Sequence, residues 1–392
     1  MHEVSPPATR AGRRPELDAI RLVVVLGLVF FHASLVFDTR DDYYVKNDET
    51  TEAITWVAGL GVVWAMPALF LIAGLGSWHS IRRRGTRGFV GERLLRLGVP
   101  LVFASLTIIP VPQWIRAGAD EPYLEFLRRY FDVHLGLSNF PFVVRGDLFE
   151  TGHLWFVVLL LTFSLMLALV AARLPPIGGP MRHRGVVFLP AVPIALVVAL
   201  HGMEEPYAGW SRWAYLLFFL LGFLLAGDDR FRAAMRRDAK PAAVIGLLLF
   251  GAAGAALSTA GDDAFTALTG PAILARTLFG LAGWFWLVAI LGLLDRDRPP
   301  AAPGARPSAR TRYLAEAALP LYILHQPILV VVAFLVVAWE LPMAVKYLAI
   351  VVLTYAIMFA VHDLLVRRTR VTRLLFGMRP AERDGEPARR VM

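Results

Sequence analysis

The chain has 392 residues; 57% of them are hydrophobic, 18% are charged and none is cysteine. This composition excludes an ordinary soluble domain, a disulfide framework, a thiolate metal site and a cysteine nucleophile. The formal net charge of +9 does not predict nucleic-acid binding. The basic residues lie in short segments between long apolar runs, as they do in the cytoplasmic loops of membrane proteins.

Apolar runs follow one another along the chain, and most are long enough to cross a bilayer as a helix. We therefore predict an all-α fold, a polytopic transmembrane helical bundle of about ten spans. The first span is too long for a signal peptide and no small-residue cleavage site follows it, so we expect it to be retained. The predicted spans are residues 17–37, 54–80, 94–112, 152–172, 186–201, 211–227, 241–260, 271–294, 314–338 and 343–366.

The segments between the spans predict orientation and domain limits. Most of the 40 basic residues fall in alternate loops, which places both termini in the cytoplasm. The chain then divides into a cytoplasmic N-terminal segment (1–16), a membrane domain (17–366) and a basic cytoplasmic tail (367–392) that we expect to be disordered. Two connections are longer than the rest: residues 113–150 outside, and residues 295–312 inside, whose proline and arginine content is typical of a flexible linker.

Charged and polar side chains interrupt the first span. Asp18 and Arg21 are three residues apart, so they share a helix face. His32 follows Arg21 by eleven residues, about three turns, which places it on the same stripe roughly 16 Å further along the helix. Ionisable groups at this depth usually face a polar cavity or the bundle interior. A lone histidine there is equally typical of a hydrogen-bonding link between helices, but the shared stripe favours a functional site.

A second basic signal begins the third predicted span. Arg93 and Arg96 lie three residues apart at its start, on one helix face. Two planar guanidiniums side by side suit phosphate groups, because each can donate two hydrogen bonds. Taken alone, the pair is more typical of a helix end whose long side chains extend to the membrane surface.

In this order, the motifs resemble the acyltransferase-3 family of integral membrane acyltransferases. The resemblance rests on "ELDAIR…FH", in which ten residues separate Arg21 from His32, and on the pair Arg93-x-x-Arg96. "MPALFLIAG" is similar to a further family motif, although Ala73 stands where serine is common. "GHLWFVVLLL" and "LPLYILHQPILV" are similar to the branch that contains glucan succinyltransferases. The resemblance covers nearly the whole chain.

The resemblance implies a membrane O-acyltransferase that takes an acyl group from cytosolic acyl-CoA. Acetyl-CoA is the expected donor, and succinyl-CoA is the alternative. Arg21, Arg93 and Arg96 would hold the phosphates of the donor, and Asp18 would orient Arg21. His32 would act as general base on the acceptor hydroxyl, and an acyl-histidine intermediate is the other possibility.

Three further side chains are candidates for the same site. The resemblance makes His325 a second catalytic candidate, although a structural polar contact would place a histidine there equally well. The neighbouring Pro327 should leave backbone carbonyls free and favour a cavity. His153 and Trp155 begin the fourth span and suit an acceptor sugar, although an interfacial aromatic cluster would look the same. The candidates for a carboxylate partner of His32 stay open among Asp147, Glu150 and Glu316.

The expected partners are membrane lipids and a carbohydrate or other envelope acceptor that carries a hydroxyl, in the plasma (inner) membrane of a bacterium. We expect no nucleic acid, and no metal because the histidines show no metal-ligand spacing. The acceptor and the oligomeric state stay open. A polytopic transporter or flippase for an envelope glycoconjugate is the alternative function, because buried charges and proline-broken spans are equally typical of transporters. That alternative leaves the order of Arg21, Arg93 and Arg96 unexplained.

Overall fold

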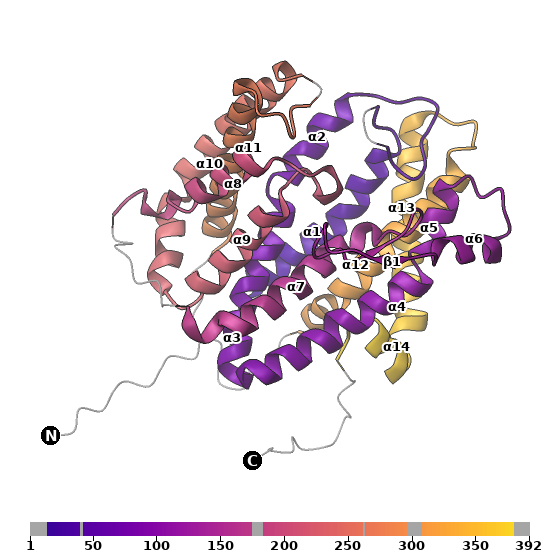
Figure 1. Cartoon of the computed structure of the whole chain (residues 1–392), viewed down its shortest axis with the longest axis horizontal. Coiled ribbons are helices and arrows are strands. Elements are labelled where there is room, and N and C mark those ends of the chain that lie inside the picture. Colours follow the sequence, from indigo (N-terminus) through magenta and orange to yellow (C-terminus); the bar gives the residue numbers. More distant parts are fainter. Residues whose placement is uncertain (1–13, 40–41, 175–182, 262, 296–307, 380–392) are drawn as a thin grey trace, which may run out of the picture.

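The computed structural model describes residues 14–39, 42–174, 183–261, 263–295 and 308–379. Helices dominate these residues (Figure 1). The one paired sheet among them is a short antiparallel hairpin of β1 (His134–Leu135) and β2 (Val144–Arg145). The all-α class predicted from the sequence is therefore confirmed.

Each helix follows an apolar run, with short 3-10 or π turns, labelled η, at several ends. The first half of the chain forms α1 (Pro15–Leu35), α2 (Ala53–Val62), α3 (Ala65–Arg93), η1 (Leu94–Gly98), α4 (Val99–Thr107), α5 (Pro110–Arg116), α6 (Tyr123–Tyr130), η2 (Gly152–Leu154), α7 (Trp155–Val170) and η3 (Ala171–Arg173). The second half forms η4 (Val186–Phe188), α8 (Ala191–His201), η5 (Glu205–Tyr207), α9 (Arg212–Leu225), α10 (Asp229–Thr259), α11 (Gly270–Leu294), α12 (Ala309–Val336), α13 (Met343–Val361), η6 (His362–Val366) and α14 (Arg370–Leu375).

Within the described ranges, 8 helical stretches are long and apolar enough to cross a membrane. One of them, Ala58–Arg116, has 59 residues, whereas a single crossing needs about 20. The backbone leaves helical geometry at Gly85, inside α3, with φ 68° and ψ 171°, and the helix that continues from this bend into α4 runs in a different direction from the first part of α3 (Figure 1). This stretch therefore contains two of the predicted spans, and the short predicted span is the apolar helix Val186–His201. The multi-pass architecture is confirmed.

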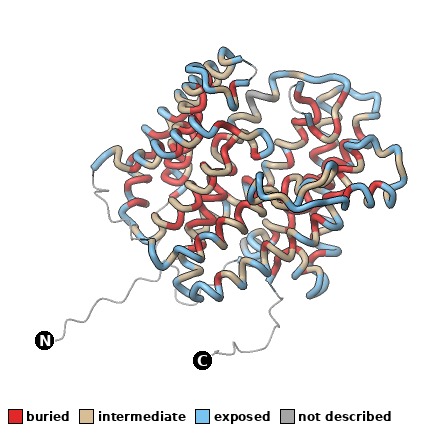
Figure 2. The backbone as a smooth tube through the Cα atoms, in the orientation of Figure 1, coloured by how far each residue is buried: buried red, intermediate tan, exposed pale blue. Residues whose placement is uncertain are grey.

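The helices pack in three groups. α8, α10 and α11 form one group, α3, α7 and α9 a second, and α12 and α13 a third. α1 contacts α3, α12 and α13, so it joins the second group to the third. The side chains between the groups are buried and belong to one apolar cluster, while the loops and the outer helix faces are exposed (Figure 2). Large apolar side chains on those outer faces are what a lipid environment requires.

α3 and α9 approach until their backbones touch. A Cβ atom on Gly74 would lie 2.0 Å from the carbonyl oxygen of Phe219, and one on Gly222 would lie 2.0 Å from that of Leu71. Only glycine fits at both positions. Small residues at helix interfaces let membrane helices pack by close van der Waals contact. This contact holds the first part of α3, before the bend, against α9.

The described part of the C-terminal tail, residues 367–379, contains a helix, whereas the sequence predicted a disordered tail. Thr369 caps α14 in a reciprocal pair of hydrogen bonds with Thr372, and α14 packs against α4 and η6. Residues 367–379 thus form a folded segment against the membrane domain. Residues 380–392 and most of the expected linker at 295–312 lie outside the described residues.

Candidate active site

Three histidines from distant parts of the sequence meet inside the bundle. His32 lies near the end of α1, His153 lies in η2 just before α7, and His325 lies in the middle of α12. The ring centroid of His325 is 5.3 Å from that of His32 and 4.9 Å from that of His153. His153 and His325 are buried. We call these three residues the histidine cluster.

Pro327 explains how α12 holds this cluster. A proline has no amide hydrogen, so the carbonyl of Ile323, four residues earlier, lacks its usual helical donor. Nε2 of His153 lies 3.1 Å from that carbonyl oxygen and donates to it, because a carbonyl only accepts. The hydroxyl of Tyr322 in turn donates to the carbonyl of His153. The carbonyl that Pro327 leaves free therefore attaches η2 to α12.

The protonation of His325 follows from its own hydrogen bond. Nδ1 of His325 donates to the carbonyl oxygen of Tyr322 at 2.5 Å, so in the neutral ring Nε2 is an acceptor. That Nε2 atom and Nδ1 of His32 are both buried, and neither has a hydrogen-bond partner in the described part of the chain. Buried polar atoms of this kind are uncommon. The two atoms belong to neighbouring rings, whose centroids lie 5.3 Å apart.

A cavity of about 210 Å³ borders the cluster. Its polar lining comes from His32, His153 and Tyr322, and the indole rings of Trp64 and Trp155 close another part. Most of the other lining residues are apolar, and those on α1 are Val23, Val24, Gly27, Leu28 and Phe31. The cavity therefore follows α1 for about two and a half turns, from Val23 to His32.

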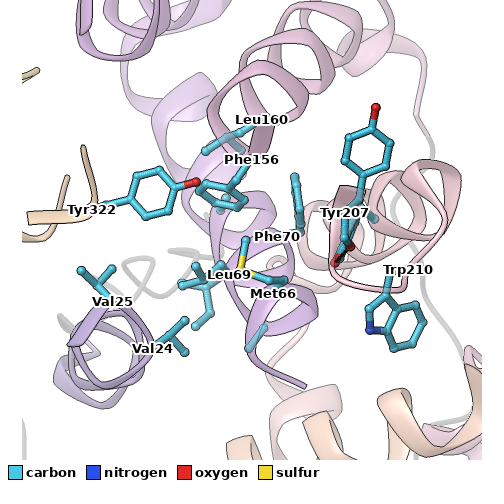
Figure 3. Packing of buried hydrophobic residues seen from close by; sticks show 14 of the residues in the cluster. Val24, Val25, Met66, Leu69, Phe70, Phe156, Leu160, Tyr207, Trp210 and Tyr322 are labelled. Carbon is cyan, nitrogen blue, oxygen red and sulfur yellow. Dashed lines mark hydrogen bonds between the residues drawn. The ribbon is translucent and has the colours of Figure 1, made fainter. Parts of the chain in front are cut away.

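Apolar side chains of four helices pack around this region (Figure 3). Val24 of α1 points toward Leu69 of α3, and Tyr322 of α12 extends toward Phe156 of α7. The rings of Tyr322 and Phe156 lie 5.7 Å apart, edge to face. This packing fixes the walls of the cavity with side chains that carry no charge.

Arg21 lies on α1 about three turns before His32, on the same face of the helix. Its Nη1 atom donates to Asp18 at 3.3 Å, and its Nη2 atom donates to the carbonyl oxygen of Ile72 in α3 at 3.3 Å. Asp18 thus holds Arg21 as the spacing predicted. A Cβ atom on Gly76 would lie 3.6 Å from Nη2 of Arg21, an ordinary van der Waals distance, so this part of α3 lies directly beside the guanidinium.

Arg93 and Arg96 lie near Arg21, although about seventy residues separate them in sequence. The three guanidiniums are close enough for their charges to repel one another. Nη2 of Arg93 donates to the hydroxyl of Ser77 at 2.9 Å, and Nε of Arg96 donates to the carbonyl of Gly377 at 3.3 Å. We call Arg21, Arg93 and Arg96 the arginine cluster. Like charges gathered in this way favour binding of a polyanion.

Two of the candidate carboxylate partners of His32 are bonded to other residues. Glu150 accepts a hydrogen bond from Gln113 at 2.6 Å, and Glu316 accepts one from Arg373 at 3.3 Å, so each is engaged by another residue. Trp155 lines the cavity and also stacks on Tyr215, with centroids 5.4 Å apart. In the described ranges, no group of three or more His, Cys, Asp or Glu side chains has a metal-binding arrangement.

The sequence did not single out three residues of the site. Tyr322 lies three residues before His325, and this helical spacing was the signal available. Ser77 lies four residues after Ala73 and accepts the hydrogen bond from Arg93. Tyr43 stacks on His32, with centroids 5.9 Å apart, but it comes from a loop without a motif. Burial raises the pKa of the neighbouring Tyr44, and the negative charge of Glu150 raises it further, so this hydroxyl stays neutral.

A comparison with protein families agrees with the geometry. A family model described as an acyltransferase domain matches residues 14–363, which include both the histidine cluster and the arginine cluster. The match supports the family as a whole and not one of its branches. No curated protein and no solved structure matches the chain. The chain belongs to the acyltransferase-3 family of membrane proteins.

Proposed function

We propose that the protein transfers an acyl group from cytosolic acyl-CoA to a hydroxyl of a carbohydrate or another cell-envelope acceptor. Acetyl is the proposed group, with succinyl as the alternative. The observation that carries the proposal is the arrangement along α1. Arg21 belongs to the arginine cluster, His32 belongs to the histidine cluster, and an apolar cavity follows the helix between Val23 and His32.

The arginine cluster supports a phosphate-bearing donor. Each guanidinium presents a planar set of donors that matches phosphate oxygens. Arg21 is fixed by Asp18 and Arg93 by Ser77, so little side-chain freedom remains to be lost on binding. A donor held here would direct its slender pantetheine arm into the cavity, whose apolar walls suit an acyl chain.

The histidine cluster supports a base at the far end of that arm. In the proposed step, His32 takes the proton of the acceptor hydroxyl while the acceptor oxygen attacks the thioester carbonyl carbon. The carbon–sulfur bond then breaks, and the proton passes from His32 to the sulfur of CoA. Nε2 of His325 would accept a hydrogen bond from Nδ1–H of His32 and thereby orient the ring. His325 would take the role that a carboxylate plays in many triads.

The proposal includes a topology. The ten predicted crossings, with both termini cytoplasmic, place the arginine cluster at the cytosolic side and the histidine cluster toward the opposite side of a bacterial plasma membrane. The donor and the acceptor would then reach the same cavity from opposite sides. His153 and Trp155 lie at the end of α7 that meets the acceptor side, where an indole ring offers a stacking surface to a sugar.

The test uses purified protein in detergent or proteoliposomes. We would measure CoA binding, and thiol release from acetyl-CoA and succinyl-CoA, for the wild type and for His32→Ala and Arg93→Ala. His134→Ala is the matched control, because this histidine is exposed in β1. We expect His32→Ala to retain binding and lose about 100-fold or more of the thiol release, Arg93→Ala to weaken binding, and the control to match the wild type.

Two results would contradict the proposal. If the wild type binds no acyl-CoA, the donor assignment is wrong, and a transporter for an envelope glycoconjugate becomes the better explanation. If His32→Ala releases thiol at the wild-type rate, the base is another group. Thermal unfolding of each variant in the same detergent separates lost chemistry from lost structure.

A further inference from the structure

Glu92, near the end of α3, has three guanidiniums around it. Its carboxylate lies 2.9 Å from Nη1 of Arg84, 3.6 Å from Nη1 of Arg96 and 3.6 Å from Nη2 of Arg379. The hydroxyl of Ser80 also donates to it, at 3.1 Å. A single carboxylate cannot neutralise three guanidiniums, so an excess of positive charge remains at this place.

Arg379 reaches Glu92 because the end of the chain is anchored. Phe376 and Met378 are buried, and the ring of Phe376 packs edge to face on Phe103 of α4, with centroids 5.5 Å apart. Arg373 is also buried, and its Nε atom donates to the carbonyl oxygen of Arg379 at 2.9 Å. We call residues 369–379 the C-terminal segment. Its anchors are apolar contacts and a buried arginine, which are stronger than a surface ion pair.

Gly377 turns the segment back toward the arginine cluster. Its φ of +70° is one that glycine adopts readily, and a Cβ atom there would lie 2.5 Å from the carbonyl oxygen of Arg96. The carbonyl of Gly377 accepts a hydrogen bond from Nε of Arg96 at 3.3 Å. The turn therefore does two things: it brings Arg379 to Glu92, and it fixes the side chain of Arg96.

We propose that the C-terminal segment is part of the donor site, where Arg84, Arg96 and Arg379 bind the ribose phosphate of the acyl-CoA donor. This inference rests on the proposed function. The donor carries a diphosphate next to its pantetheine arm and a separate phosphate on the ribose. Arg21 and Arg93 bond to residues inside the bundle, so they suit the diphosphate. The guanidiniums around Glu92 include that of Arg379, whose side chain is 64% exposed, and they suit the phosphate that lies farther from the arm.

Glu92 has a defined role in this arrangement. Without a donor, its carboxylate keeps like charges together that would otherwise repel one another. When the ribose phosphate binds, its oxygens accept hydrogen bonds from the unused guanidinium N–H groups, since an arginine has five N–H donors. The excess positive charge offsets the repulsion between the phosphate and Glu92.

The test compares two ligands on the full-length protein in detergent. Isothermal titration gives the dissociation constants of CoA and of 3′-dephospho-CoA, which lacks only the ribose phosphate. The variants are Arg379→Ala and, as matched control, Arg370→Ala, an exposed arginine of the same segment. We expect Arg379→Ala to weaken CoA binding about tenfold and to leave 3′-dephospho-CoA binding unchanged. Arg370→Ala should bind both ligands as the wild type does.

A second variant tests the turn itself. Gly377→Val keeps every arginine but places a side chain against the carbonyl of Arg96, and we expect it to weaken CoA binding at least as much as Arg379→Ala. The inference is overturned if both variants bind CoA like the wild type, or if they weaken the two ligands equally. A wild type that binds neither ligand would instead overturn the proposed function, and this inference with it.

Discussion

The contact between His32 and His325 is the one on which the proposed chemistry depends. His325→Leu removes the acceptor for Nδ1–H of His32, so we expect kcat to fall about tenfold to 100-fold while KM for acyl-CoA stays the same. The acid side of the pH–rate profile should move to lower pH, because an imidazole without that acceptor is a weaker base. His325→Gln supplies another acceptor and should restore part of kcat.

Steady-state kinetics from about pH 5 to 9, the range in which histidines titrate, would check this prediction. A His325→Leu variant that changes KM alone, or keeps both kcat and the pH profile of the wild type, would show that His325 only supports the fold. Thermal unfolding should give similar midpoints for the Leu and Gln variants, because the two side chains are similar in volume.

At this scale the sequence predicted some residues well and others not at all. The pairing of Asp18 with Arg21 follows from helical spacing, and the structure confirms it. The free carbonyl near Pro327 was predicted as well, but the sequence could not name His153 as its donor, because that contact joins residues 170 positions apart. The expected partner of His32 was a carboxylate. The nearest candidate in the structure is an imidazole, and only the crossing of α1 and α12 brings the two together.

At the scale of single helices, α8 ends in a way that the sequence did not reveal. A helix leaves its last carbonyls without intrahelical donors. Arg276 of α11 is fully buried; its Nε and Nη2 atoms donate to the carbonyl of Ala199 at 3.2 and 2.9 Å, and its Nη1 atom donates to that of Ala264 at 3.1 Å. One side chain therefore ties α11 to the end of α8 and to the loop before α11.

We expect Arg276→Met to lower the free energy of unfolding by about 2 kcal/mol, because it leaves two buried carbonyls without donors. The measurement is the thermal unfolding midpoint of the purified protein in detergent, with the exposed Arg83→Met as the control. If both variants unfold at the wild-type temperature, water satisfies these carbonyls and the arginine is not needed. CoA binding should be the same in both variants, since Arg276 lies in a different helix group from the arginine cluster.

The limits of the helices show what hydropathy alone can and cannot fix. It located every apolar run, since each bilayer crossing requires one. It did not predict α14, because six residues of mixed polarity carry no span signal. Their helix depends on the cap by Thr369 and on burial of Phe376 against α4, and both are tertiary features.

For the whole molecule, the absence of cysteine makes the topology directly testable. Single cysteines would be introduced as His134→Cys in the β1 hairpin and as Arg87→Cys after the bend in α3, both at exposed positions. With both termini cytoplasmic, we expect a membrane-impermeant maleimide to label the His134→Cys variant but not the Arg87→Cys variant in intact cells. Both variants should react after the membrane is permeabilised.

Labelling of the Arg87→Cys variant in intact cells would reverse the topology and place the arginine cluster outside. The donor would then have to be an extracellular polyanion, and the acyl-CoA proposal would fail. An unlabelled parent chain, which has no thiol, is the control for the background in both preparations.

Arg21 and His32 lie on one continuous helix, α1, so the distance between them along the helix axis is fixed. The eleven residues between them set a gap of roughly 16 Å that any donor must bridge while its anion stays at Arg21. Acetyl phosphate, in which the anion is bonded directly to the acyl group, is too small to reach both residues. The protein would therefore discriminate among activated acyl compounds by molecular length, in addition to any contacts that the cavity makes with the acyl group. Such a filter would reject small reactive metabolites and yet would accept acyl groups of different sizes on the same carrier.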